Sequence, residues 1–152
     1  MFFTSDKLFS RKNLHIAKVI IHEGYDKKMQ INDIALLQLR EPVDLSVYMP
    51  ACLPAKDKDW TGQTGWVYGW GTLREGGSSS TLLRETTQEV VDRARCEEAL
   101  QREESSVQIT EDMLCGYTAG QDSCQGDSGG PFTIQVGQEY YQQADFEKTI
   151  FL

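Results

Sequence analysis

The residues best suited to chemistry lie in one segment, 122–131, which reads DSCQGDSGGP. It combines a candidate nucleophile, Ser128, with two acids and closely spaced glycines. A serine hydroxyl attacks a carbonyl carbon when a base removes its proton and N–H donors bind the oxyanion. Gly126 and Gly129 let the backbone turn tightly enough to aim such donors. The segment therefore indicates acyl-transfer chemistry, although its composition alone is also that of an ordinary glycine turn.

A further acid, Asp33, stands at the start of an apolar run. Residues 34–39 read IALLQL, a run short enough for a strand with both faces largely covered. A carboxylate at the mouth of such a strand is either a solvated strand-end residue or the orienting acid of a catalytic triad. The order of the other motifs along the chain favours the second interpretation.

Five motifs, taken in order, resemble the chymotrypsin/trypsin family of serine proteases. They are NDIALL at 32–37, CLP at 52–54, GWG at 69–71, MLCGY at 113–117 and the segment 122–131. The likeness covers about residues 14–141 and is specific, because five ordered motifs rarely coincide. It implies an all-β fold, a partial chymotrypsin-like double antiparallel β-barrel with the end of the first barrel, most of the second and a short helix near Arg93 to Gln101. Residues 1–152 then form one incomplete trypsin-like peptidase domain with a divergent tail at 142–152.

The resemblance also implies a role for each candidate site residue. Asp33 would be the acid of the triad, Ser128 its nucleophile, and the N–H groups of Gly126 and Ser128 the oxyanion hole. Asp122 stands where trypsin-like members keep an acid at the base of the substrate pocket, which implies cleavage after Arg or Lys. Asp127 matches the acid that pairs with the new amino terminus when the zymogen is cleaved.

The catalytic histidine of the family, normally in an Ala-Ala-His-Cys motif well upstream of Asp33, has no counterpart in these residues. The two histidines, His15 and His22, lack that motif, so we interpret both as structural or solvated. In serine proteases, loss of one triad member lowers turnover on the order of a million-fold. The chain also begins MFFT instead of with the Ile-Val-Gly-Gly type of activated start. We therefore expect this chain alone to be inactive, with Asp127 turned outward in a zymogen-like or disordered loop.

The four cysteines contain one complete pair. The resemblance pairs Cys96 with Cys115, a bond that would contribute about 3 kcal/mol if unstrained. Cys124 matches a cysteine whose family partner lies on a later strand, and Cys52 matches one that usually tethers a propeptide or an upstream chain. Both would be orphans here, and in a reducing compartment an orphan thiol is better interpreted as a buried apolar group.

Another disulfide of the family is missing at both of its positions. Gly65 and Ile134 stand where the two cysteines often lie. Because both cysteines are absent together, a random sequence error is disfavoured, and a lineage that dropped one bridge is favoured.

Charge and targeting signals limit the partners. The net charge of −8 disfavours nucleic acid and anionic membranes, since both recruit Lys and Arg surfaces. Protein substrates or inhibitors with Arg or Lys suit it better. We expect no metal and no cofactor, because paired zinc spacings are absent and the calcium loop of the family would fall in the poorly matched first dozen residues. The family implies secretion, but MFF is too short for a signal core, and a missing upstream segment explains this conflict most simply.

Three hypotheses follow for the function. The chain is part of a trypsin-like serine endopeptidase, or a non-catalytic pseudoprotease or decoy module that holds a basic partner, or a truncated product with no separate function. Residues 132–136 and 139–142 predict two strands joined by a turn at 137–138. Since incomplete barrels leave strand edges unpaired and apolar faces half covered, we expect marginal stability and a tendency to associate.

Overall fold

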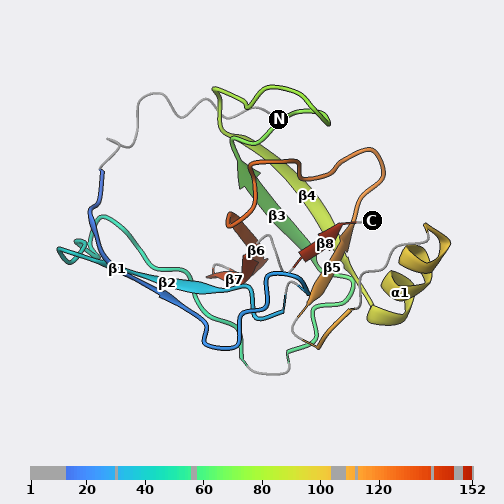
Figure 1. Cartoon of the computed structure of the whole chain (residues 1–152), viewed down its shortest axis with the longest axis horizontal. Coiled ribbons are helices and arrows are strands. Elements are labelled where there is room, and N and C mark those ends of the chain that lie inside the picture. Colours follow the sequence, from blue (N-terminus) through green and yellow to red (C-terminus); the bar gives the residue numbers. More distant parts are fainter. Residues whose placement is uncertain are drawn as a thin grey trace. The chain divides into compact units, whose positions relative to one another are not determined.

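The computed structural model describes residues 13–29, 31–55, 58–103, 109–111, 113–137, 139–145 and 149–151. The chain divides into two compact units, and the boundary between them falls after Pro50. Figure 1 shows the elements of both units, which are described separately below. All strands named here are assigned within the described residues.

The unit that ends at Pro50 contains an antiparallel pair of strands, β1 (Ile16–Ile21) and β2 (Ala35–Leu39). Branched residues dominate β1, as expected for a strand. Large side chains of both strands remain exposed, including Val19 at 54%, Leu36 at 65% and Leu37 at 56%. The prediction that residues 34–39 form a strand is confirmed, but the prediction that both faces are covered is wrong. Within the described residues the sheet of this unit is two strands wide.

The second unit is built on a six-stranded sheet. Its strands are β3 (Thr64–Gly69), β4 (Arg84–Val91), β5 (Leu114–Tyr117), β6 (Pro131–Val136), β7 (Glu139–Asp145) and β8 (Thr149–Phe151), in the order β7-β6-β3-β4-β5-β8. Neighbours run antiparallel except β5 and β8, which are parallel. The predicted hairpin of β6 and β7 is present, and Gly137 turns between them with φ at 64°. Gln138, the second predicted turn residue, lies outside the described residues.

The core of this unit forms where side chains of three strands meet. The buried residues that pack together are Trp60, Val67, Val90, Phe132 and Ile134. Gly65 pairs with Ile134 across β3 and β6. The ring of Phe132, which is completely buried, lies directly over Gly65, where a Cβ atom would come within 2.6 Å of ring carbons Cε1 and Cε2. A glycine within a strand often marks such a close approach.

The predicted helix is also present, as α1 (Arg93–Arg102). Asp92 caps its first turn, because its Oδ1 accepts the backbone N–H of Arg95 at 2.9 Å. Cys96 of the helix forms the expected disulfide with Cys115 of β5, with 6.2 Å between the Cα atoms. This bond fastens the helix to β5, the strand next to the edge strand β8.

Candidate active site

The segment 122–131 forms two consecutive turns between β5 and β6. The N–H of Asp127 donates to the carbonyl of Cys124 at 3.0 Å, and the N–H of Gly130 donates to the carbonyl of Asp127 at 2.9 Å. Gly126 has φ at 95°, in the region that favours glycine. This geometry places Ser128 on the surface, where it is exposed.

The carboxylate of Asp127 points into the protein. Its Oδ1 accepts the N–H of Gly71 at 2.7 Å, and its Oδ2 accepts the N–H of Cys124 at 3.0 Å. The expectation that Asp127 turns outward is therefore wrong. The physical reason is that two backbone donors stabilise the charge, so that a half-buried carboxylate does not require a cation to remain inside.

Glycines make room for this carboxylate. A Cβ atom on Gly71 would lie 2.5 Å from both carboxylate oxygens of Asp127, and a Cβ atom on Gly69 would also overlap the carboxylate. No side chain can therefore occupy either position while Asp127 keeps its place. The GWG motif, noted in the sequence only as a family mark, is thus part of the site.

Two N–H groups of the serine loop are free to bind a ligand. Among the described residues, neither the backbone N–H of Gly126 nor that of Ser128 has a hydrogen-bond partner. The neighbouring thiol is occupied, since the hydroxyl of Thr72 lies 2.8 Å from the sulfur of Cys124. Cys124 and Cys52 both remain free cysteines, and both are half-buried.

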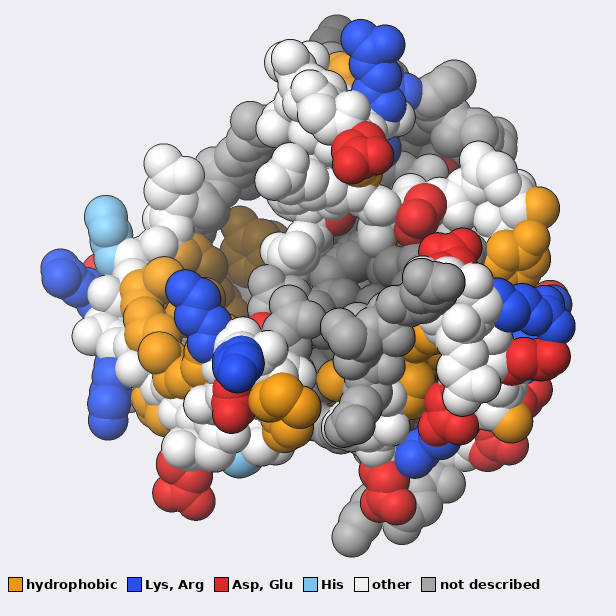
Figure 2. Space-filling model, turned by 45° about the vertical axis from the view of Figure 1, so that its right-hand side comes forward, with side chains coloured by type: hydrophobic (Ala, Val, Ile, Leu, Met, Phe, Trp, Pro, Cys, Tyr) orange, Lys and Arg blue, Asp and Glu red, His pale blue; other side chains and the backbone are white. Residues whose placement is uncertain are grey.

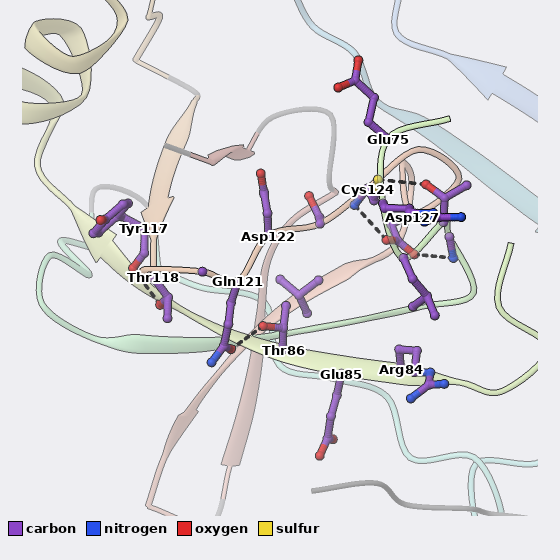
Figure 3. A pocket seen from close by; sticks show the side chains of 18 of the residues that line it. Glu75, Arg84, Glu85, Thr86, Tyr117, Thr118, Gln121, Asp122, Cys124 and Asp127 are labelled. Atoms are coloured by element: carbon purple, nitrogen blue, oxygen red, sulfur yellow. Dashed lines mark hydrogen bonds between the residues drawn. The ribbon is translucent and has the colours of Figure 1, made fainter. Parts of the chain in front are cut away.

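A pocket of about 940 Å³ opens beside this loop. Its wall comes from residues 71–75, from residues 84–86 of β4 and from the segment 117–124, and Asp127 closes one part of it. Figure 3 shows Glu75, Glu85, Asp122 and Asp127 around it, together with Arg84. Arg74 also lines the pocket, so its wall carries four acids and two bases and suits a ligand with a positive charge.

Asp122 is an exposed residue whose carboxyl lies on the wall of the pocket. Loss of hydration through partial burial raises the pKa of its carboxyl above the ordinary value, although a hydrogen bond from the backbone of Ser123 acts in the opposite direction. The carboxyl has therefore lost part of its water shell. A cationic group would compensate for that loss.

Asp33 lies two residues before β2, in the unit that ends at Pro50, and is half-buried. The residue before it, Asn32, adopts φ at 54°. Ser128 belongs to the other unit, so the site described above consists of the serine loop, Asp127 and the pocket. The structure groups Asp122, Asp127 and Ser128 within one unit.

The two histidines have local contacts. Nδ1 of His22 accepts the N–H of Gly24 at 3.0 Å, and the backbone carbonyl of His15 accepts the N–H of Arg40 at 2.8 Å. Both are exposed, which agrees with the interpretation that they are structural or solvated. Two further residues that sequence reasoning missed, Thr86 and Gln88 of β4, contact the segment that carries Asp122.

The described part of the chain contains neither a candidate metal cluster nor a membrane-spanning helix. There, no three His, Cys, Asp or Glu side chains are grouped so that they could hold a metal ion. No helix in these residues is both long enough and apolar enough to cross a membrane.

Two β units, with an exposed serine on a glycine turn beside an acidic pocket, define an all-β protein of the chymotrypsin-like class. The family model described as Trypsin matches residues 4–143, and the chain belongs to this family.

Relatives agree with this assignment. The chain is 36% identical over 148 residues to Serine protease filzig of Drosophila melanogaster, an alignment that covers 94% of this chain and 9% of the relative. It is 40% identical over 110 residues to Trypsin alpha-4 of Lucilia cuprina, covering 72% of this chain and 42% of that protein. With Trypsin-1 of Astacus astacus it shares 37% identity over 135 residues, covering 86% and 55%. The chain thus spans about half or less of the length of these three relatives.

Proposed function

We propose that this chain is part of a serine endopeptidase that cleaves protein substrates after Arg or Lys. The observation that carries the proposal is the serine loop itself, in which an exposed Ser128 lies beside two unused N–H groups. Ser128 is the nucleophile, and Asp33 orients the histidine that acts as its base. Secretion follows from the same assignment, because the family acts outside the cell.

The unused N–H groups of Gly126 and Ser128 support the role of oxyanion hole. As the serine oxygen adds to the substrate carbonyl, negative charge develops on the carbonyl oxygen. Donors that are fixed before the reaction stabilise that charge without reorganisation, and one such donor accounts for about 10²–10³ in turnover. The turn at Gly126 fixes these donors.

The pocket supports the preference for Arg or Lys. Asp122 lies on its wall in a partly dehydrated position, where a guanidinium or ammonium group would restore the missing interactions. A neutral side chain in the same place would leave the Asp122 charge unpaired, which disfavours substrates without a basic residue.

Asp127 supports an activation step. Backbone donors use one direction on each carboxylate oxygen, and no Lys or Arg forms an ion pair with Asp127 in the described residues. A carboxylate offers about four acceptor directions, so an amine has room to bind as well. The amino terminus released by zymogen cleavage is the proposed partner.

We propose that this chain of 152 residues, taken alone, does not cleave peptide bonds. Both of its histidines are exposed, and neither lies in the Ala-Ala-His-Cys motif that carries the catalytic base of the family. A base is needed because the serine hydroxyl is a weak nucleophile at its free pKa. Cys52, which is free here, is the proposed attachment point for an upstream chain.

A fluorophosphonate probe tests both parts of this proposal. The printed chain should remain unlabelled, whereas a chimera that adds the histidine-containing part of Trypsin-1 of Astacus astacus should be labelled at Ser128. Ser128→Ala in the chimera is the matched control and should abolish labelling. Labelling of the printed chain would show that its inactivity was wrongly proposed, and an unlabelled, folded chimera would contradict the role of Ser128.

A second function, a decoy that binds a basic partner without cleaving it, is favoured by the acidic pocket. In that case the printed chain retains a basic protein inhibitor in a pull-down, Ser128→Ala retains it equally, and Asp122→Asn loses it. If the chain neither reacts with the probe nor retains the inhibitor, the third hypothesis remains, namely a product with no separate function.

A further inference from the structure

A buried polar side chain lies on the core face of β4. Gln88 is completely buried, although Val90, two residues further along the same face, belongs to the apolar core. An amide in such surroundings is unfavourable unless its hydrogen bonds are made. The contacts of Gln88 therefore indicate why the chain keeps a polar residue there.

Two polar side chains on this face of β4, those of Thr86 and Gln88, bind the same residue. Nε2 of Gln88 donates to the backbone carbonyl of Gln121 at 2.9 Å. The hydroxyl of Thr86 donates to Oε1 of Gln121 at 2.6 Å. Gln121 directly precedes Asp122, and Figure 3 shows it reaching to Thr86 on β4 while Asp122 points to the other side. The strand thus holds the chain one residue before the pocket acid.

The segment needs such support because it is a surface turn. The N–H of Gln121 donates to the carbonyl of Thr118 at 3.1 Å, and Gly120 adopts φ at 73°. Gln121 and Asp122 are exposed, and apolar packing does not hold them. The turn follows directly on β5 at Tyr117, and the two hydrogen bonds from β4 tie its far end, Gln121, to the sheet.

We infer that Gln88, assisted by Thr86, is a positioning residue for Asp122 and sets the affinity of the pocket for a cationic group. Gln88 does not touch the ligand but acts through the carbonyl of Gln121. The inference rests on the proposed role of Asp122, and it adds a specificity element that lies in the interior of the sheet. Restricting the turn limits the conformational entropy that is lost when a ligand binds.

Gln88→Met in the full chain tests this inference. Methionine keeps the length and volume but lacks the amide donor. It also removes Oε1, a buried atom that has no partner among the described residues, and this gain offsets the loss of the hydrogen bond to the carbonyl of Gln121. We expect an unchanged or higher urea midpoint. The dissociation constant of benzamidine should nevertheless rise about two- to tenfold, the range of one net hydrogen bond.

Amide hydrogen exchange gives a readout that is independent of ligand binding. In Gln88→Met, exchange at residues 120–123 should accelerate by a similar factor while exchange in β3 and β6 stays the same. Val90→Ala is the matched control on the same strand face, and it should lower the midpoint without changing the exchange pattern of the turn or the benzamidine affinity. Thr86→Val should accelerate exchange at residues 120–123 and weaken benzamidine binding by part of the same factor. Thr86→Ser keeps the hydroxyl and should behave like the parent in both measurements.

Unchanged exchange at residues 120–123 in Gln88→Met would overturn the inference. If Asp122→Asn weakens benzamidine binding, unchanged benzamidine affinity in Gln88→Met would overturn it as well. If Asp122→Asn has no effect, the proposed role of Asp122 fails instead, and the exchange data alone then decide whether Gln88 positions the turn.

Discussion

A methyl group added at Gly65 is expected to destabilise the second unit through one identifiable contact. The new Cβ atom would overlap Cζ of Phe132 and would lie 2.6 Å from Cε1 and Cε2. Nonbonded carbons prefer about 3.5–4.0 Å, so the ring must retreat by more than about 1 Å. Phe132 is completely buried and packs in the core with Val67 and Ile134, which leaves it no free space to enter.

The magnitude follows from two opposing effects. Overpacking of this kind costs about 1–3 kcal/mol, and replacing glycine in a strand returns about 0.5–1 kcal/mol of backbone entropy. We expect Gly65→Ala to lower the free energy of unfolding by about 1–2 kcal/mol. With a urea slope of about 2 kcal/mol/M, the midpoint followed by tryptophan fluorescence should fall by about 0.5–1 M.

A double-mutant cycle assigns the loss to the ring. Phe132→Leu alone should destabilise by leaving a cavity, but in the double variant with Gly65→Ala the methyl group enters part of that cavity. The two changes should therefore be less harmful together than their sum, by about 1 kcal/mol. Strictly additive losses, or a Gly65→Ala variant as stable as the parent, would refute the reasoning.

The other predictions concern charge, the helix cap and the disulfide. Because burial raises the pKa of Asp122 above 3.8, its ionised form weakens folding, and this penalty is absent below the unfolded pKa and complete above the folded pKa. Asp122→Asn should therefore be more stable than the parent at pH 7 but not at pH 3, as measured by urea unfolding at both pH values. Asp92→Ala removes the acceptor for the N–H of Arg95 and should cost about 1 kcal/mol, seen as a lower urea midpoint, whereas Asp92→Ser should retain most of it. Replacing Cys96 and Cys115 together by alanine should cost about 3 kcal/mol, and a reducing agent should then no longer shift the midpoint of the variant.

The fold was predictable where the signal was local or already known from the family motifs. The helix near Arg93 to Gln101 was expected from the family resemblance and is present as α1, and the turn between β6 and β7 contains the expected Gly137. The pairing of Cys96 with Cys115 came from the family order of the cysteines, since spacing alone does not determine connectivity.

The parts that were wrong depend on partners that are distant in the sequence. Asp127 was expected to turn outward because no cation was visible for it, but one of its donors, the N–H of Gly71, lies 56 residues away. Backbone donors leave no mark in the residue types. The coverage of β2 was also misjudged, because an apolar run does not reveal how many strands pack on it. Figure 2 shows hydrophobic side chains gathered on part of the exposed surface.

The anchoring of Asp127 changes what an activating amine has to supply. Its carboxylate is held by backbone N–H groups, and the glycines at 69 and 71 are needed because any Cβ atom there would overlap it. The motifs GWG and DSGG, far apart in the sequence, are therefore joined by the carboxylate of Asp127. Because this contact forms within the chain itself, the turn at Ser128 does not depend on a cation for its shape. In the proposed activation step, the amine would then mainly compensate the charge of Asp127, since the N–H groups of Gly126 and Ser128 are already unoccupied.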